Sequence, residues 1–311
     1  LVEVIVEFNQ APAKVEVKKE ALKGKKLSLH SAKEKVEKSH SEFKAHIRKQ
    51  RARKSSSLYD ASKIEVKREY KNAFNGVSMK LPGIAVEELL QSGEVKRIWS
   101  NAQVQLDLPS EEETKMKPKM ADSIPQIGVD KLHDEGVTGK GIKVGVLDTG
   151  IDYTHADLID ACEGYRAENG QDPEAVDPAS VKGWDFINND ADPMEATYDE
   201  WKAASMPEFL NSSAYYTSHG THVSGTIAAQ KDNAVDYAVK GVAPDVDLFA
   251  YRVLGPYGSG TTDGVLAGID KAVEDGMDVI NLSLGASVND PLYPTSVAIN
   301  NAMISGVVSV V

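Results

Sequence analysis

The sequence contains a single cysteine among its 311 residues, Cys162. One cysteine excludes a disulfide within the chain and a zinc site built from several cysteines. No apolar run reaches the roughly 18 residues of a membrane span, so we expect no transmembrane helix. The first residue is not methionine and no secretory leader pattern follows it. We therefore expect a processed product or a segment that begins within a longer protein.

Basic residues are scarce overall, since 35 Lys and Arg stand against 47 Asp and Glu, for a formal net charge of −12. The imbalance is uneven: residues 1–115 carry a net charge of +6 and residues 116–311 one of −18. A basic segment can bind nucleic acid, but no interleaved aromatic and basic residues and no nucleic-acid-binding motif accompany it. We expect no nucleic-acid partner and predict instead that the two segments attract one another.

Residues 1–108 have the pattern of a small α+β domain. Ser31 and Glu34 form a capping-box pattern that opens a helix, and apolar residues then recur at helical spacing. The helix positions expected to be buried are Val36, His40, Phe43 and Ile47. Strands are predicted at 2–8, 63–70, 75–81, 95–99 and 102–108, and a second helix at 83–93. The order β-α-β-β-α-β is the split βαβ arrangement of ferredoxin-like domains, which by itself indicates no function.

Residues 109–126 mix Pro, Lys and Glu without apolar periodicity. This composition predicts an exposed linker and therefore a natural processing region.

From residue 127 to residue 311 the pattern changes to alternating strands and helices. The strands predicted at 141–147, 246–253, 277–284 and 307–311 are continuously apolar, which is typical of strands covered on both faces. Between them lie predicted helices, including one rich in small residues over 221–230. The pattern predicts an α/β fold with a doubly wound parallel sheet, and ligands of such sheets bind at the carboxyl ends of the strands.

Asp148 directly follows the first of these strands, and His219 opens the helix of small residues. A buried aspartate at a strand end requires a partner. It could cap the amides of Thr149 and Gly150, or it could orient His219 as a general base. A metal site remains an alternative, built from Asp148, Asp152, His155, His219 and His222, although the H-x-x-H spacing lacks the glutamate of known zinc motifs.

Two stretches, VGVLDTGIDYTHADL at 144–158 and SHGTHVSGTIAA at 218–229, resemble the aspartate and histidine motifs of the subtilisin-like serine proteases, or subtilases. The stretches at 239–260 and 278–285 are similar to the strands that follow in that family. The basic amino-terminal domain is similar to the family's inhibitory propeptide, which is ferredoxin-like. The resemblance therefore covers nearly the whole chain, except the segment between the two motifs.

The resemblance implies a role for particular residues. Asp148 and His219 match the triad aspartate and histidine, and His222 matches a second, packing histidine. Two segments match those that hold an extended substrate between them as a third strand: Gly258, Ser259 and Gly260, and Ser283, Leu284 and Gly285. Such strand addition binds a peptide through its main chain.

The chain departs from the family pattern in three respects. No Gly-Thr-Ser-Met-Ala stretch with the catalytic serine occurs, and the oxyanion asparagine that should follow 307–311 is missing. We expect a catalytic domain cut short before its serine.

Asp148 and His219 lie 71 residues apart, farther than in compact members, and we expect the extra residues to form surface loops near the cleft. Asp157 matches a calcium ligand of the family, and carboxylate oxygens suit Ca²⁺.

These observations predict a secreted or cell-surface serine endopeptidase zymogen that acts on protein or peptide substrates. It comprises a propeptide at 1–108, a processing linker at 109–126 and the first part of a catalytic domain at 127–311. No cofactor is required, and a structural calcium is a candidate at Asp157. The alternatives are a non-catalytic inhibitory or folding-assistant fragment that acts through its propeptide, and the metallohydrolase named above. An unfinished sheet edge also predicts self-association.

Overall fold

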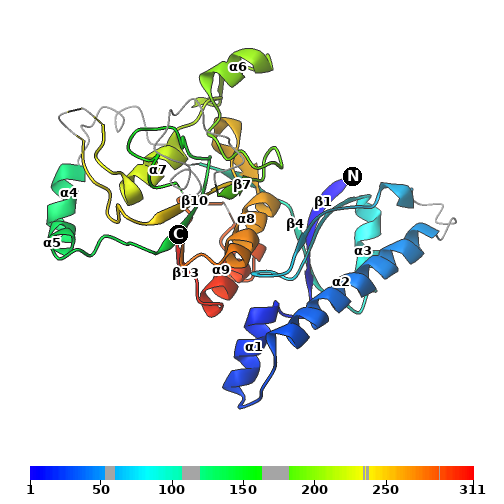
Figure 1. Ribbon diagram of the computed structural model, residues 1–311. Coiled ribbons are helices and arrows are strands. Elements are labelled where there is room, and N and C mark those ends of the chain that lie inside the picture. Colours follow the sequence, from blue (N-terminus) through cyan, green and yellow to red (C-terminus); the bar gives the residue numbers. More distant parts are fainter. Residues whose placement is uncertain (53–59, 107–119, 163–181, 234, 236–237, 287) are drawn as a thin grey trace. The chain divides into compact units, whose positions relative to one another are not determined.

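The computed structural model describes residues 1–52, 60–106, 120–162, 182–233, 235, 238–286 and 288–311. The chain forms two compact units. Unit 1 consists of Leu1–Gln103, Thr261–Asp275 and Val288–Val307, and unit 2 consists of Val104–Gly260, Gly276–Ser287 and Val308–Val311. Figure 1 shows the elements of both units.

Unit 1 contains a four-stranded sheet in which every neighbouring pair is antiparallel. The sheet order is β2-β3-β1-β4. Its strands are β1 (Val2–Phe8), β2 (Glu65–Tyr70), β3 (Gly76–Leu81) and β4 (Val95–Ser100). This order and the helices between the strands confirm the α+β domain predicted for the amino-terminal segment.

Helix α2 (Leu29–Ala52) lies along this sheet in Figure 1, and its apolar face joins the core formed by β1 and β3. The four positions predicted to be buried are all buried. The predicted helix start is wrong, because the hydroxyl of Ser28 accepts the N–H of Ser31 at 3.1 Å and the helix begins at Leu29. The other helices of unit 1 are α1 (Ala13–Leu22), α3 (Val86–Leu89), α8 (Thr262–Asp275) and α9 (Pro294–Ile304).

Unit 2 is built on a five-stranded sheet in which all neighbours are parallel, as the alternating pattern predicts. The order is β13-β12-β6-β10-β7. The strands are β6 (Lys143–Asp148), β7 (Gly183–Asp185), β10 (Asp247–Arg252), β12 (Val279–Asn281) and β13 (Val308–Val310). After β6 the chain forms β7 and β10 on one side of it and later β12 on the other, so the carboxyl end of β6 is a topological switch point.

Charged residues align at that edge of the sheet. Arg252, at the end of β10, is in register with Asp148 of β6 and with Asp185 of β7. Arg252 and Asp185 are both buried and form an ion pair at 2.8 Å. The other oxygen of Asp185 accepts the N–H groups of Ile187 and Asn188. A buried charge requires such partners, and here they fix the loop that follows β7.

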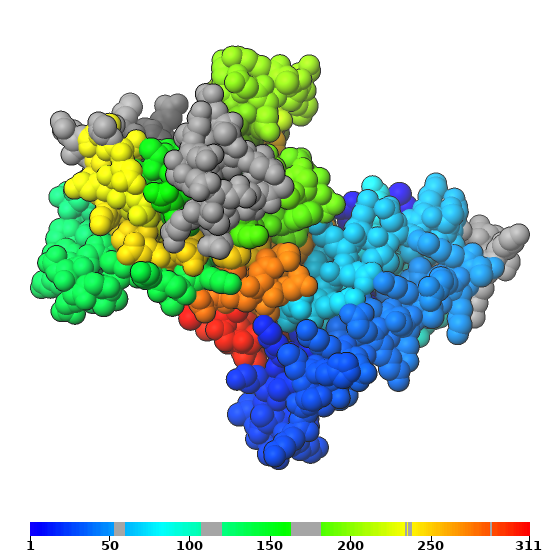
Figure 2. Space-filling view, viewed as in Figure 1, coloured from blue at the N-terminus to red at the C-terminus, as the bar shows by residue number. Residues whose placement is uncertain are grey.

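The remaining elements of unit 2 are short. They are α4 (Met120–Gln126), α5 (Val129–Asp134), α6 (Tyr198–Ala204), β8 (Phe209–Leu210), β9 (Ser213–Ala214) and α7 (His219–Ala228). The part of the chain with α6, yellow-green in Figure 2, projects from the surface. Of the predicted processing region, residues 109–119 lie outside the described residues, and residues 120–126 form α4, which has no buried residue. Within the ranges given above, no helix is long and apolar enough to cross a membrane.

Candidate active site

Asp148 ends strand β6 and is only 1% exposed. One carboxylate oxygen, Oδ1, accepts the backbone N–H of Thr149 at 2.7 Å and its hydroxyl at 3.2 Å. The same oxygen accepts the Nδ1–H of His219 at 2.8 Å. The carboxylate therefore contacts both the turn and the histidine, and its backbone donor in the turn is the amide of Thr149.

His219 is the first residue of α7, and its side chain is 25% exposed. The hydrogen bond to Asp148 raises the pKa of His219, and the charges of Asp148 and Glu195 act in the same direction against the effect of burial. The geometry fixes the tautomer, since Nδ1 must carry a proton to donate to a carboxylate. The Nε2 nitrogen of the neutral ring is then an acceptor.

A close approach of two backbones brings the histidine to the aspartate. A Cβ atom on Gly220 would lie 2.0 Å from the carbonyl oxygen of Gly150, so only glycine fits there. The N–H of Gly220 donates to the hydroxyl of Thr149 at 2.9 Å. Gly150 itself has φ +117°, a conformation that other residues rarely adopt. The small residues of the histidine motif therefore position His219.

Sequence reasoning missed a second buried carboxylate, Glu195, in the segment between the two motifs. It is 4% exposed and accepts the N–H of Thr221 at 2.9 Å and the hydroxyl of Thr221 at 3.2 Å. The hydroxyl of Thr217 also donates to it. Burial raises the pKa of Glu195. No local pattern marks this residue, because its partners are 22 and 26 positions away.

The other residues of the predicted metal site have different surroundings. His222 is exposed, so its predicted packing role is wrong. Asp152 accepts the N–H and hydroxyl of Thr154, and Nδ1 of His155 accepts the N–H of Asp157, so both residues serve local turns. Among the residues with described positions, no three His, Cys, Asp or Glu side chains are grouped so that they could hold a metal ion. The metallohydrolase alternative has no site among them.

Asp157, the candidate calcium ligand, binds the loop that contains Asp232 and Asn233. Its Oδ1 accepts the N–H groups of Asp232 and Asn233, and its Oδ2 accepts the side-chain amide of Asn233 at 3.0 Å. Both oxygens of this carboxylate therefore accept N–H groups. Residues 234 and 236–237 of the same loop lie outside the described residues, and the calcium site stays a prediction.

The two predicted substrate segments lie on either side of an extended stretch, Val104–Leu106. The N–H of Leu106 donates to the carbonyl oxygen of Gly258 at 3.0 Å. Gln105 forms an antiparallel bridge with Gly285, and its side-chain amide donates to the carbonyl of Tyr257 at 2.9 Å. Strand β11 (Ser259–Thr261) pairs with β5 (Gln103–Gln105). The end of the amino-terminal domain thus occupies the place between Gly258 and Gly285.

The sequence predicts surface loops near the cleft for the segment between the motifs, and part of this segment contacts the turn before Gly258. Tyr257 has φ +62° and is buried. Its N–H donates to the carbonyl of Tyr215 at 3.2 Å, its hydroxyl donates to the carbonyl of Pro207, and the rings of Tyr215 and Tyr257 meet edge to face. The hairpin formed by β8 and β9 therefore supports the turn that precedes Gly258, rather than being surface loop alone.

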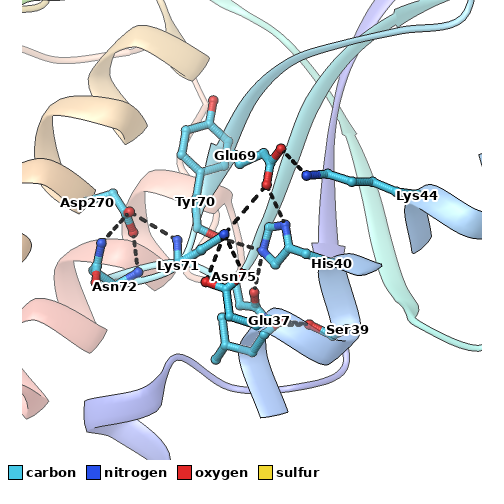
Figure 3. A network of polar contacts seen from close by, with 11 residues as sticks. Glu37, Ser39, His40, Lys44, Glu69, Tyr70, Lys71, Asn72, Asn75 and Asp270 are labelled. Carbon is cyan, nitrogen blue, oxygen red and sulfur yellow. Dashed lines mark hydrogen bonds and ion pairs between the residues drawn. The ribbon is translucent and has the colours of Figure 1, made fainter. Parts of the chain in front are cut away.

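Within unit 1, one carboxylate by which helix α8 contacts the amino-terminal domain is that of Asp270, shown at the left of Figure 3. Asp270 is buried and accepts backbone N–H groups from four consecutive residues at 2.7 to 3.1 Å. These residues are Lys71, Asn72, Ala73 and Phe74. The turn between β2 and β3 is therefore anchored on a helix from the other end of the chain.

Comparison with known proteins agrees with these features. A family profile described as "Subtilase family" matches residues 139–311, and one described as "Peptidase inhibitor I9" matches residues 3–107. The chain is 41% identical over 292 residues to the "Minor extracellular protease Vpr" of Bacillus subtilis (strain 168), covering 92% of this chain and 32% of that protein. It is 33% identical over 201 residues to "Subtilisin E" of the same organism, covering 63% of this chain and 41% of that protein.

The chain therefore spans between about a third and a half of the length of these relatives. Among solved structures, fervidolysin from Fervidobacterium pennivorans, described as a keratinolytic enzyme related to subtilisin, matches with a TM-score of 0.56. That match covers 99% of this chain and 39% of the other, at 20% sequence identity, and indicates a shared fold.

Proposed function

Because the chain belongs to the subtilase family, we propose that it is the amino-terminal part of a serine endopeptidase precursor in which Asp148 and His219 are two members of an Asp-His-Ser triad. The observation that carries this proposal is the 2.8 Å hydrogen bond between His219 Nδ1 and Asp148 Oδ1, at the switch point of a parallel sheet. Residues 1–108 are then the propeptide, 109–126 the processing region and 127–311 the first part of the catalytic domain.

The proposed chemistry assigns one proton path to His219. Asp148 holds the Nδ1–H, so that Nε2 takes the proton of the serine hydroxyl as its oxygen attacks the peptide carbonyl carbon. His219 then gives this proton to the leaving amine, and water hydrolyses the acyl-enzyme by the same steps. The raised pKa of His219 supports this role, because Asp148 stabilises the imidazolium that forms. The 311 residues contain no Gly-Thr-Ser-Met-Ala stretch, so the serine and the oxyanion asparagine are assigned to a segment outside them.

Protein or peptide chains are the proposed substrates. The extended stretch Val104–Leu106 supports this assignment, since it lies between Gly258 and Gly285 as a substrate strand would. The same contact supports the amino-terminal domain as the inhibitory partner of the catalytic domain. A relative of the chain is named as an extracellular protease, which supports a secreted or cell-surface location.

The test uses the complete gene product and an extended chromogenic peptide. His219→Ala is expected to lower kcat by at least about a thousandfold, because triad members act as a unit. His222→Ala, three residues along the same helix and exposed, is the matched control and is expected to retain activity. Equal turnover in His219→Ala and the wild type would remove the triad assignment.

An inhibitory fragment is the second candidate, favoured by the occupied place between Gly258 and Gly285. In this case the amino-terminal domain of the 311-residue chain binds a mature subtilisin and inhibits it. Inhibition that saturates at one chain per enzyme is expected, and its absence at micromolar concentration would reject the candidate.

Self-association is proposed through strand β13, where Val308 and Val310 are more than half exposed. Sedimentation that gives only the monomer at high concentration would reject it.

A further inference from the structure

Helix α7, which begins with His219, has no cap of its own. The residue before it, Ser218, makes no side-chain hydrogen bond to the helix, and the first turn contains no acidic residue. The first N–H groups of a helix nevertheless need acceptors, and an anion is favourable near them because of the helix dipole. Glu195 meets both needs from a distant part of the chain, since its carboxylate accepts the N–H of Thr221 at 2.9 Å.

The same segment also touches the turn that follows Asp148. The N–H of Ile151 donates to the carbonyl of Pro193 at 3.0 Å, and the N–H of Thr217 donates to that of Ala196 at 2.9 Å. A Cβ on Gly150 would lie 2.7 to 2.9 Å from the backbone of this segment. Residues 193–196 therefore connect the turn after β6 with the start of α7.

Thr221 completes the connection. Its hydroxyl donates to Glu195 at 3.2 Å and accepts the N–H of Asp152 at 2.8 Å. Two hydrogen bonds thus extend from the Glu195 carboxylate through Thr221 to the loop after Asp148. Removing Glu195 would leave the Thr221 N–H without its acceptor in a partly buried position.

Two carboxylates act on the imidazole of His219. Asp148 contacts Nδ1 directly, and the charge of Glu195 adds to the rise in the pKa of His219. Burial raises the pKa of Glu195 and the charge of Asp148 adds to the rise, whereas the hydrogen bonds from Thr217 and Thr221 oppose it. The carboxylate is held in place by these two donors, one on each side of His219 in the sequence.

We infer that Glu195 is a positioning residue for His219: its carboxylate caps α7, fastens the start of this helix to the turn after Asp148, and adds negative charge beside the imidazole. The effect of Glu195 on catalysis rests on the proposed function, in which His219 is the general base. Its structural part stands on hydrogen bonds within unit 2 and can be tested without turnover.

The test compares Glu195→Gln and Glu195→Ala by NMR in the 311-residue chain, with His219→Ala used to assign the His219 resonances. Gln keeps an acceptor for Thr221 and loses the charge, so the pKa of His219 is expected to fall while the Thr221 amide stays protected from exchange. Ala loses both, so exchange of the Thr221 amide is expected to rise at least about tenfold. An unchanged His219 pKa in both variants, with unchanged Thr221 protection in Glu195→Ala, would overturn the inference.

Glu200→Gln is the matched control, because it removes one charge from the same segment. Its side chain caps α6 through the N–H of Thr197, and glutamine can keep that bond. It is expected to change neither readout. If the pKa of His219 falls as much in Glu200→Gln as in Glu195→Gln, the change is an effect of net charge alone, and the inference is overturned. If Glu195→Ala does not fold, the pKa of His219 in Glu195→Gln decides alone.

In the complete gene product, Glu195→Ala is expected to lower kcat about tenfold or more with little change in KM, and Glu195→Gln less. A loss confined to KM would count against positioning of the base. If the wild-type product proves inactive, or His219→Ala retains turnover, the proposed function fails, and the NMR results still decide whether Glu195 positions His219.

Discussion

The backbone N–H of Leu106 donates to the carbonyl oxygen of Gly258 at 3.0 Å, and the Leu106 side chain is buried. Glycine is favoured at position 258 for two reasons. Its φ is +65°, and a Cβ atom there would lie 2.9 Å from Cδ1 of Leu106. The turn that holds Gly258 is in turn supported by Tyr257 and its contacts with the hairpin β8–β9.

Gly258→Ala is therefore expected to loosen the Val104–Leu106 stretch. The new methyl group would force Leu106 away and strain the backbone, because residues with a Cβ rarely adopt a positive φ. Hydrogen exchange of the Leu106 amide in the 311-residue chain is expected to rise at least about tenfold. In the complete gene product, kcat/KM for extended peptides should fall with it.

Gly285→Ala is the matched control on the other side of the stretch. A Cβ on Gly285 would meet nothing within 4 Å, and its φ is not positive. The Leu106 amide is expected to keep its wild-type exchange rate in this variant. Equal protection in Gly258→Ala and Gly285→Ala would contradict the steric role given to position 258.

Asp148→Asn tests the source of the raised pKa of His219. The carboxylate stabilises the imidazolium, so its loss is expected to lower the pKa of His219, as measured by NMR titration of the 311-residue chain. In the complete gene product the proposed general base is the neutral ring of His219. The wild type should therefore gain activity as the pH rises through an apparent pKa above about 6.5.

In Asp148→Asn the activity should fall by a factor on the order of 10⁴, because an amide does not hold the required tautomer. Asp199→Asn is the control, since this carboxylate is 93% exposed and lies in α6. A pKa of His219 that stays at its wild-type value in Asp148→Asn would show that the hydrogen bond is not its cause.

The sequence predicted what depends on local periodicity and motif. The continuous apolar strands indicated the parallel sheet, and the two motifs placed Asp148 at the end of a strand and His219 at the start of a helix. Element starts were less certain. The cap of α2 lies at Ser28, three residues before the predicted one, because Ser31 and Glu34 also satisfy the pattern. Helix α1 was missed because AKVEVKKEAL has no clear apolar face.

Tertiary contacts could not be predicted in this way. Glu195 accepts from residues 22 and 26 positions later, and Arg252 pairs with Asp185 across 67 positions, so no local pattern marks either contact. His222 was assigned to the core from the family match, yet it lies on the exposed side of α7. The family resemblance identified the motif residues, but for the segment between the motifs it predicted surface loops near the cleft and did not mark Glu195.

Asp270→Ala is expected to weaken the attachment of the β2–β3 turn to α8. Four backbone N–H groups would lose their acceptor, and those of Ala73 and Phe74 are buried. A hydrogen bond to a charged group contributes about 1.5 to 3 kcal/mol. Because four such bonds are lost, the free energy of unfolding should fall by at least about 2 kcal/mol. Urea unfolding of the 311-residue chain, followed by Trp99 fluorescence, measures this loss.

Glu274→Ala, on the same helix, is the control for that measurement. Glu274 is exposed and pairs only with Lys271 among the contacts recorded for it, so the change should cost less than about 0.5 kcal/mol. Similar unfolding curves for Asp270→Ala and Glu274→Ala would show that the four N–H groups find other acceptors.

His40 makes the stability of unit 1 depend on pH. It is 2% exposed, and its Nε2 donates to Asn75 and to the carbonyl of Tyr70, at the centre of Figure 3. Burial lowers the pKa of His40, Lys71 lowers it further, and Glu69, 3.3 Å from Nδ1, opposes them. A base whose pKa is lower in the folded state binds its proton more readily when unfolded. The stability that depends on neutral His40 is complete above about pH 6.5 and is lost as the pH falls below this value.

The free energy of unfolding of unit 1, followed by Trp99 fluorescence, is therefore expected to decrease between about pH 7 and 5 by up to about 1.4 kcal/mol for each unit of pKa depression. In His40→Gln this part of the pH dependence should disappear, because the side chain no longer titrates. His30→Gln, whose side chain is 84% exposed, should retain it. If the slope in His40→Gln matches the slope in His30→Gln, another group is responsible for the acid sensitivity of this unit.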